Sequence, residues 1–183
     1  MREYRGQLIK ALRGLDMDVY DAILILLYDV LSEGNGLFLI GNGGSSANAS
    51  HITNDFVKLI PDKTGRDVQA HCLSDNVPLI TALANDNDYE DIFAAQVRTF
   101  MSYGDALIAF SGSGNSPNII KAVKVANDIT SSVTIGLCGR GGGELAQEAT
   151  RALIVPSESM QIIEDVHLAI AHSLCVDLIE LFQ

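Results

Sequence analysis

The chain has 183 residues, 48% of them apolar, and its formal net charge at pH 7 is −11. A chain of this size is expected to fold as a single domain, because it can bury roughly 70% of its unfolded surface. The acidic balance and the lack of a basic block exclude nucleic acid as a partner, and no apolar run approaches the roughly 20 residues that cross a membrane. The amino terminus lacks an apolar leader, so we expect a cytoplasmic protein.

The first predicted element is a long N-terminal helix over residues 1–34. Between Tyr4 and Glu33 there is no proline, and apolar residues recur at alternating spacings of four and three: Leu8, Leu12, Leu15, Val19, Ala22 and Leu26. A second apolar stripe makes the apolar surface of this helix wider than one contact face needs. This favours packing on another subunit as well as on residues 35–183.

Five short apolar runs follow, separated by segments long enough for crossover helices. They span residues 37–40, 68–73, 106–110, 133–138 and 152–155. The runs are continuous and do not alternate, which is typical of parallel strands buried on both faces. The sequence therefore predicts an α/β fold, a doubly wound five-stranded parallel sheet flanked by helices, with a last helix over residues 161–182.

The cysteines and two of the histidines are expected to be structural. Cys72, Cys138 and Cys175 lie in apolar surroundings and form no CxxC pair, so we interpret them as buried thiols. His71 lies inside an apolar strand run and is expected to be a core histidine. His167 is expected to pack internally or at an interface.

A glycine-rich loop follows the first strand. Its sequence from Gly41 to Ser46 is GNGGSS, and it leads into a helix whose first N–H groups can bind an anion. The alternative is a simple tight turn between strand and helix. The loop lacks the third glycine of a dinucleotide fingerprint and the lysine of a P-loop.

A serine-rich loop follows the third strand. Ser111, Ser113 and Ser116 provide three hydroxyls within six residues, with glycines between them, and Pro117 suits a first helical turn. This pattern indicates a neutral cradle for a phosphate at the end of a parallel strand, where ligands of such sheets bind. The alternative is a serine helix cap, which needs only one hydroxyl.

A third candidate feature is the pair His51 and Asp55. The two residues are four apart on the helix after the first loop and hence on one face, as in a metal clip or an acid–base pair. The alternative is a surface pair with a structural role.

Taken together, GNGGSS followed by His51, SGSGNSPN, and EDVHLAIAH in the last helix resemble the sugar isomerase (SIS) domain family, and within it the phosphoheptose isomerases. The resemblance covers almost the whole chain. It implies a homotetramer built partly through the first helix, and conversion of sedoheptulose 7-phosphate to a glycero-manno-heptose 7-phosphate through an enediol.

The resemblance also implies roles for individual residues. Ser111, Ser113 and Ser116 with Gly112 would hold the phosphate, Asn42, Gly43 and Ser45 would face the sugar, and Asn85 and Asp86 would lie near it, although Asp86 also suits a polar turn. His51, Asp55, Glu164 and His172 align with residues that bind zinc, and Asp55 and His172 would be catalytic. Glu164 counts in addition as a substrate-binding candidate.

Two positions depart from the family pattern. Asp55 is one methylene shorter than the family's glutamate, and Glu164 replaces a glutamine, which adds a charge favourable to a divalent cation. Glu164 and His172 are eight residues apart, about 12 Å along an ideal helix, so they converge only if Glu164 lies at or before the first turn. These departures leave open a noncatalytic SIS module that binds a phosphosugar or a protein partner. A nucleotide-binding α/β protein is disfavoured by the missing glycine.

Overall fold

The computed structural model describes all 183 residues, and its centre is a five-stranded parallel sheet. The strands are β1 (Leu37–Gly41), β2 (Ala70–Cys72), β3 (Ala106–Ser111), β4 (Val133–Cys138) and β5 (Arg151–Ile154). They pair in the order β2-β1-β3-β4-β5, all in parallel. The predicted doubly wound sheet is confirmed.

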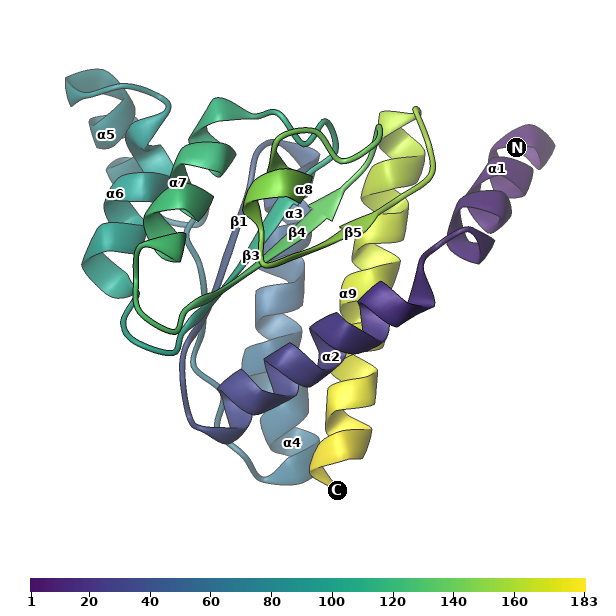
Figure 1. Cartoon of the computed structure of the whole chain (residues 1–183), viewed down its shortest axis with the longest axis horizontal. Coiled ribbons are helices and arrows are strands. Elements are labelled where there is room, and N and C mark those ends of the chain that lie inside the picture. Colours follow the sequence, from purple (N-terminus) through teal and green to yellow (C-terminus); the bar gives the residue numbers. More distant parts are fainter.

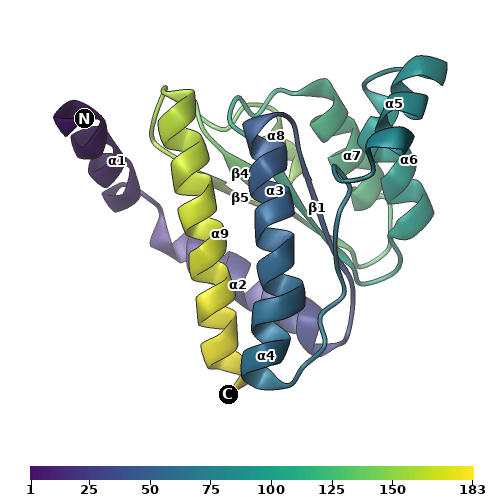
Figure 2. The same ribbon diagram turned by 180° about the vertical axis from the view of Figure 1, so that it is seen from behind.

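Helices cover both faces of the sheet (Figures 1 and 2). One face carries α2 (Met17–Ser32), α3 (Gly44–Asn54), α4 (Ile60–Thr64) and α9 (Met160–Phe182), and the other carries α6 (Asp91–Phe100), α7 (Pro117–Asn127) and α8 (Leu145–Glu148). A π-helix, η1 (Asp55–Leu59), joins α3 to α4, and α5 (Val77–Asp86) packs on α6. None of the helices has both the length and the apolar character needed to span a membrane.

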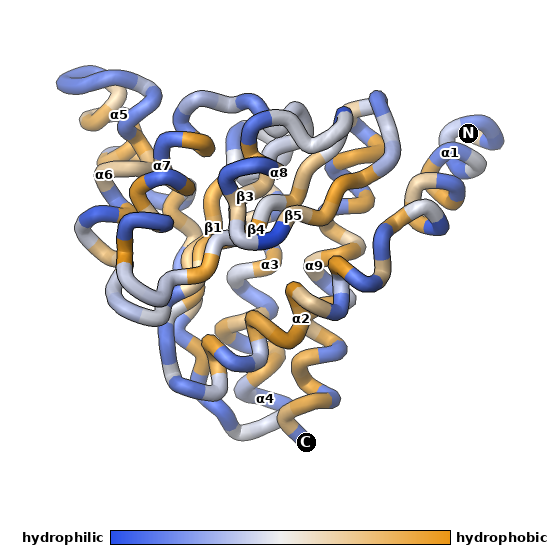
Figure 3. The backbone as a smooth tube through the Cα atoms, in the orientation of Figure 1, coloured by the Kyte–Doolittle hydropathy of each residue, from blue (hydrophilic) through white to orange (hydrophobic).

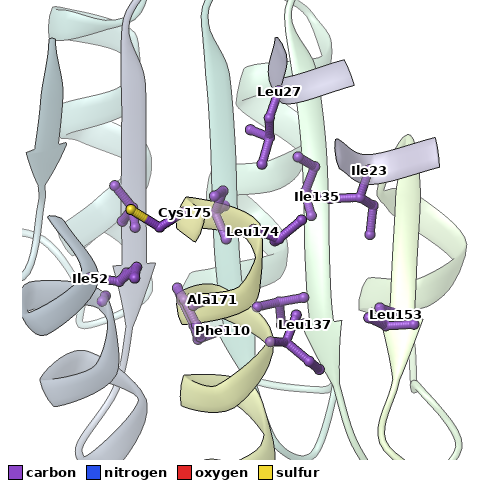
Figure 4. Packing of buried hydrophobic residues seen from close by; sticks show 14 of the residues in the cluster. Ile23, Leu27, Ile52, Phe110, Ile135, Leu137, Leu153, Ala171, Leu174 and Cys175 are labelled. Carbon is purple, nitrogen blue, oxygen red and sulfur yellow. The ribbon is translucent and has the colours of Figure 1, made fainter. Parts of the chain in front are cut away.

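The larger core lies between the sheet and the helices that include α2 and α9. Figure 4 shows side chains from these helices meeting those of the strands, including Ile23, Leu27, Leu174, Ile135 and Leu137. Figure 3 shows that apolar residues dominate α2, whereas the loops at the carboxyl ends of the strands are mostly polar. Burial of the inner strands on both faces explains their continuous apolar runs.

The predicted single N-terminal helix is wrong, because the structure has two. Helix α1 (Arg2–Arg13) ends at Gly14, whose N–H group bonds to the carbonyls of Lys10 and Ala11. Helix α2 then begins after Asp16, whose side chain accepts hydrogen bonds from the N–H groups of Asp18 and Val19. This N-cap satisfies donors that a helix start leaves free, and it turns the chain between the two helices.

The edge strand β2 is shorter than predicted, and its middle residue is an exposed histidine. His71 is exposed and its ring stacks on Phe38, so the prediction of a core histidine is wrong. An edge strand has no neighbour on one side, and here only one residue of three is buried. Cys72 is half-buried, whereas Cys138 and Cys175 are buried as expected.

Candidate functional site

Two loops at the carboxyl ends of β1 and β3 form the upper part of the candidate site. After β1 the chain turns so tightly that a Cβ on Gly41 would lie 2.5 Å from the backbone carbonyl of Ser45. Gly43 has a φ of +55°, in the left-handed region that favours glycine. Ser45 is buried beneath this turn. The glycines therefore shape the turn between β1 and α3, as both interpretations of the sequence require.

The side-chain amide of Asn42 is bonded to another amide, and its place near the sugar stays a prediction. Nδ2 of Asn42 donates to Oδ1 of Asn118, and Nδ2 of Asn118 donates to Oδ1 of Asn42, each at 2.8 Å. The hydroxyl of Tyr89 also donates to Oδ1 of Asn42 at 3.0 Å. The pair links the β1 loop to the first turn of α7.

Sequence reasoning missed both partners of Asn42. Asn118 belongs to the motif SGSGNSPN, but nothing in the spacing indicated that its side chain is buried. Tyr89 follows the ANDND run and carries no local signal.

The serine loop after β3 brings its hydroxyl groups close together. Oγ of the buried Ser111 donates to Oγ of Ser116 at 3.3 Å, and Oγ of Ser113 accepts a bond from the N–H of Asn115. Ser116 is the N-cap residue of α7, yet its side chain makes no capping bond, so its hydroxyl remains available to a ligand. The loop therefore offers hydroxyl groups at a helix N-terminus, which is the chemistry of an anion site without cationic side chains.

The β4 loop packs directly against the serine loop. A Cβ on Gly139 would lie 2.9 Å from the carbonyl oxygen of Gly112, and the N–H of Leu145 donates to the carbonyl of Gly114 at 2.8 Å. Beneath these loops, Nε2 of the buried His167 donates to the carbonyl of Cys138 at 3.1 Å. Burial lowers the pKa of His167 to about 4, so this imidazole is neutral near pH 7. His167 is thus a packing residue, as expected.

A cluster of two imidazoles and one carboxylate joins α3, η1 and α9. Nε2 of His51 lies 3.0 Å from Nε2 of His172, and Nε2 of His172 lies 3.4 Å from Oδ2 of Asp55. Three ligand atoms, one from each residue, all lie within 4.8 Å of one another. Two nitrogens bound to tetrahedral zinc at about 2.0–2.1 Å lie about 3.3 Å apart, close to the separation seen here. The donor set and its spacing fit a divalent cation.

Asp55 is held at the point where the helix changes type. It caps α3 and is the first residue of the π-helix η1, and such π segments occur frequently at functional sites. Nδ2 of Asn54 donates to Oδ1 of Asp55 at 3.3 Å, which leaves Oδ2 facing His172. The shorter carboxylate therefore still reaches the imidazole pair.

Glu164 lies outside the cluster of three residues, and its role as a fourth metal ligand stays a prediction. Helix α9 begins at Met160, so Glu164 lies within the helix, about one turn after its first residue. The carboxylate of Glu164 points at Gly44, the first residue of α3. Helices α3 and α9 lie side by side in Figure 2. His51 follows Gly44 by seven residues and His172 follows Glu164 by eight, so the cluster lies about 10–12 Å further along both helices.

Asn85 and Asp86 lie at the end of α5, and their amide and carboxylate bond to each other at 2.8 Å. Both are exposed. The structure brings neither into contact with the serine loop or with the metal-type cluster, that is, His51, Asp55 and His172. In Figures 1 and 2, α5 lies at the opposite side of the molecule from α9. The role of this pair near a sugar stays a prediction.

Comparison with known proteins places the chain among its relatives. The sequence profile of the SIS domain matches residues 3–139. A phosphoheptose isomerase of Aquifex aeolicus is 39% identical over 150 residues, covering 82% of this chain and 78% of the relative. A probable phosphoheptose isomerase of Thermoplasma acidophilum is 34% identical over 185 residues, covering 99% and 98%. The solved structure of phosphoheptose isomerase GmhA from Neisseria gonorrhoeae superposes with a TM-score of 0.86 at 29% identity, covering 97% of this chain and 93% of that one. The chain belongs to the SIS domain family and, within it, to the phosphoheptose isomerases.

Proposed function

We propose that the chain is an aldose–ketose isomerase that converts sedoheptulose 7-phosphate to a glycero-manno-heptose 7-phosphate. The observation that carries this proposal is the cluster of His51, Asp55 and His172, which joins an acid–base pair to a ligand set for a divalent cation. A module that only binds a phosphosugar has no need of two imidazoles and a carboxylate at such short separations. The relatives' names support the same reaction.

In this proposal the serine loop holds the phosphate. Ser111, Ser113 and Ser116 provide hydroxyl donors, Gly112 lets the backbone approach closely, and the first turn of α7 adds its positive end. The chain has a net charge of −11, so hydroxyls and main-chain groups suit this task where lysines are scarce. Gly43, Ser45 and Glu164 are assigned to the sugar, since Gly44 and Glu164 meet beside the β1 loop.

The isomerisation moves one proton between adjacent carbons. In our assignment Asp55 removes a proton from C1 of the ketose to give the enediol and returns it to C2, and His172 moves the hydroxyl proton between the two oxygens. His51, Asp55 and His172 would hold a divalent cation, for which we propose zinc, and that cation would polarise the carbonyl group. Asp55 has one oxygen toward His172 and a second bonded to Asn54, so it can serve proton and cation with different atoms.

The decisive experiment is an assay of the purified chain with sedoheptulose 7-phosphate after loading with zinc, manganese, cobalt or magnesium. We expect aldose to form in at least one metal-loaded sample, and we expect this activity to be lost after the metal is removed by a chelator. Binding of the phosphosugar without turnover in every sample would instead assign the chain to noncatalytic SIS modules, which is the alternative that the changed residues at 55 and 164 leave open.

We also propose a homotetramer in the cytoplasm, assembled partly through α1 and α2. The support is a cavity of about 400 Å³ between these helices and α9, lined mostly by apolar residues that include Leu12, Leu15, Met17, Ile170 and Val176. Met17 and Val176 are half exposed, which favours a covering partner. Light scattering coupled to size exclusion tests the assembly directly, and a mass of one chain would contradict it.

A further inference from the structure

A cavity lies away from the loops that carry the proposed chemistry. It has a volume of about 530 Å³, within the range of about 300–1,000 Å³ typical of small-molecule sites. Gly36 and Asp105 line it, and they directly precede β1 and β3. The cavity therefore lies beside the amino ends of these strands, between the edge strand β2 and α6, whereas the serine loop follows their carboxyl ends.

Gln96 of α6 presents an unpaired oxygen to this cavity. The side chain is 97% buried, because Gln96 has only 3% of its surface exposed. Nε2 donates to the carbonyls of Leu73 at 2.9 Å and Ile92 at 2.8 Å, so both amide hydrogens are used and the orientation of the amide is fixed. Oε1 accepts no hydrogen bond. It is not enclosed by protein either, because Nδ1 of His167 is the only fully enclosed side-chain nitrogen or oxygen that lacks a hydrogen-bond partner. Oε1 of Gln96 is therefore accessible from the cavity, where it can accept a bond from a ligand.

Rings line the same cavity. The rings of Phe38 and His71 stack with centroids 5.5 Å apart and an angle of 29° between their planes. Phe100 and Tyr103 lie at the rim with half or more of their surface exposed, 50% and 66%. Exposed aromatic side chains beside a cavity favour a flat ligand, because stacking on an aromatic ring removes apolar surface of both partners from water.

The charges around the cavity exclude an anionic ligand. No lysine or arginine lines it, and Asp105 is its only carboxylate. Both oxygens of Asp105 are occupied, since Oδ1 accepts from the N–H of Gly36 and Oδ2 from the N–H of Ser102, each at 2.7 Å. The other polar side chains of the lining include the neutral amides of Asn35, Gln69 and Asn76 and the hydroxyl groups of Ser102 and Tyr103. A sugar phosphate would therefore find no counter-charge here.

We propose that this cavity binds a neutral aminopurine nucleoside. Its base stacks against the aromatic side chains at the rim, its exocyclic amino group donates to Oε1 of Gln96, and its ribose hydroxyls bond to the neutral amides. The volume suits a two-ring base with its sugar better than a single ring. Because the cavity lies at the other end of the strands from the serine loop, nucleoside and sugar phosphate bind at the same time.

Titration calorimetry of the full chain with three probes tests the hydrogen bond and the charge. We expect adenosine to bind, purine riboside, which lacks only the amino group, to bind about fivefold more weakly, and adenosine monophosphate to bind no more tightly than adenosine. Equal affinity for adenosine and purine riboside would overturn the role of Gln96. No heat and no chemical-shift change at millimolar adenosine would overturn the site itself.

Two variants and a competition test the location. Tyr103→Ala and Phe100→Ala remove exposed side chains, so they leave folding intact and weaken adenosine binding by about fivefold or more. Tyr89→Ala is the matched control, because Tyr89 is similarly exposed at 56% but lies outside the cavity lining, and its adenosine affinity stays unchanged. Displacement of adenosine by sedoheptulose 7-phosphate would overturn the proposal, as would a changed oligomeric state of Tyr103→Ala with unchanged affinity. All these readouts are independent of isomerase activity.

Discussion

Replacing Asn118 by alanine breaks the link between the two loops of the candidate site. Oδ1 of Asn118 accepts bonds from Asn42 at 2.8 Å and from the N–H of Ile119 at 3.0 Å, and its Nδ2 donates to Asn42 at 2.8 Å. Each such bond contributes about 0.5–1.5 kcal/mol, so we expect the free energy of unfolding to fall by about 2–4 kcal/mol. For a chain of this length the melting temperature should fall by roughly 5–15 °C.

A double-mutant cycle with Asn42→Ala separates the pair from other effects. Urea unfolding of the four proteins, followed by circular dichroism at one fixed protein concentration, gives the free energies. The double variant should lose at least about 1 kcal/mol less than the sum of the single losses, because each single change leaves a partner unpaired and the double change does not. Asn87→Ala is the control, since Asn87 is exposed and its side chain makes no hydrogen bond. Additive losses would refute the paired arrangement.

Three further predictions concern the proposed site and its support. Ser113→Ala should weaken binding of the phosphosugar by about 1–3 kcal/mol with an unchanged urea midpoint, and an unchanged Michaelis constant and inhibitor affinity would speak against its role. His172→Ala should lose bound metal, measured by atomic emission, together with activity, whereas retention of both would remove His172 from the site. The pKa of His167 is lowered to about 4 by burial, so the unfolded chain binds a proton that the folded chain does not between pH 6.5 and 4. Stability should therefore fall by up to about 3 kcal/mol as the pH is lowered through this range. His167→Gln keeps a donor for Cys138 and should flatten that dependence, and an equal slope in both proteins would assign the acid sensitivity to other groups.

The strands were the most predictable part of the fold. Burial on both faces of β1 and β3 leaves a continuous apolar run, and such a run has one simple interpretation when helix-length segments separate it from the next. The edge strand β2 was harder, because a strand with one free side tolerates an exposed residue such as His71. A run of similar composition can therefore belong to the interior or to the edge.

The break in the N-terminal helix shows how one signal can hide another. Gly14 and Asp16 are good stop and cap residues, and both are visible in the sequence. The apolar spacing nevertheless continues through them, because α1 and α2 both use apolar residues to pack, α1 chiefly beside α9 and α2 against α9 and the sheet. Periodicity reports which residues are buried, but it does not report whether the helix axis is straight.

The metal-type cluster was only half predictable from spacing. His51 and Asp55 are four positions apart, so their proximity follows from local geometry, whereas their approach to His172 depends on how α3 packs against α9. The resemblance to a family supplied that second half. It also supplied Glu164, which lies eight positions before His172 on α9 and outside the cluster of three, so its part in a metal site stays a prediction.

Glu164 distinguishes the two loops that the sequence offered as anion sites. Both loops begin a helix, and a negative charge near a helix N-terminus is stabilised by about 0.3–1 kcal/mol. At α3 the protein's own carboxylate holds this place, since Glu164 lies against Gly44, so a phosphate there would meet a like charge. At α7 the acidic neighbour Glu144 is paired with Lys124 at 2.7 Å, and the hydroxyl of Ser116 is free of capping. We therefore expect the phosphate to bind at the serine loop, and the neutral hydroxyl groups of the sugar to lie at the α3 loop, where they can donate hydrogen bonds to the carboxylate of Glu164.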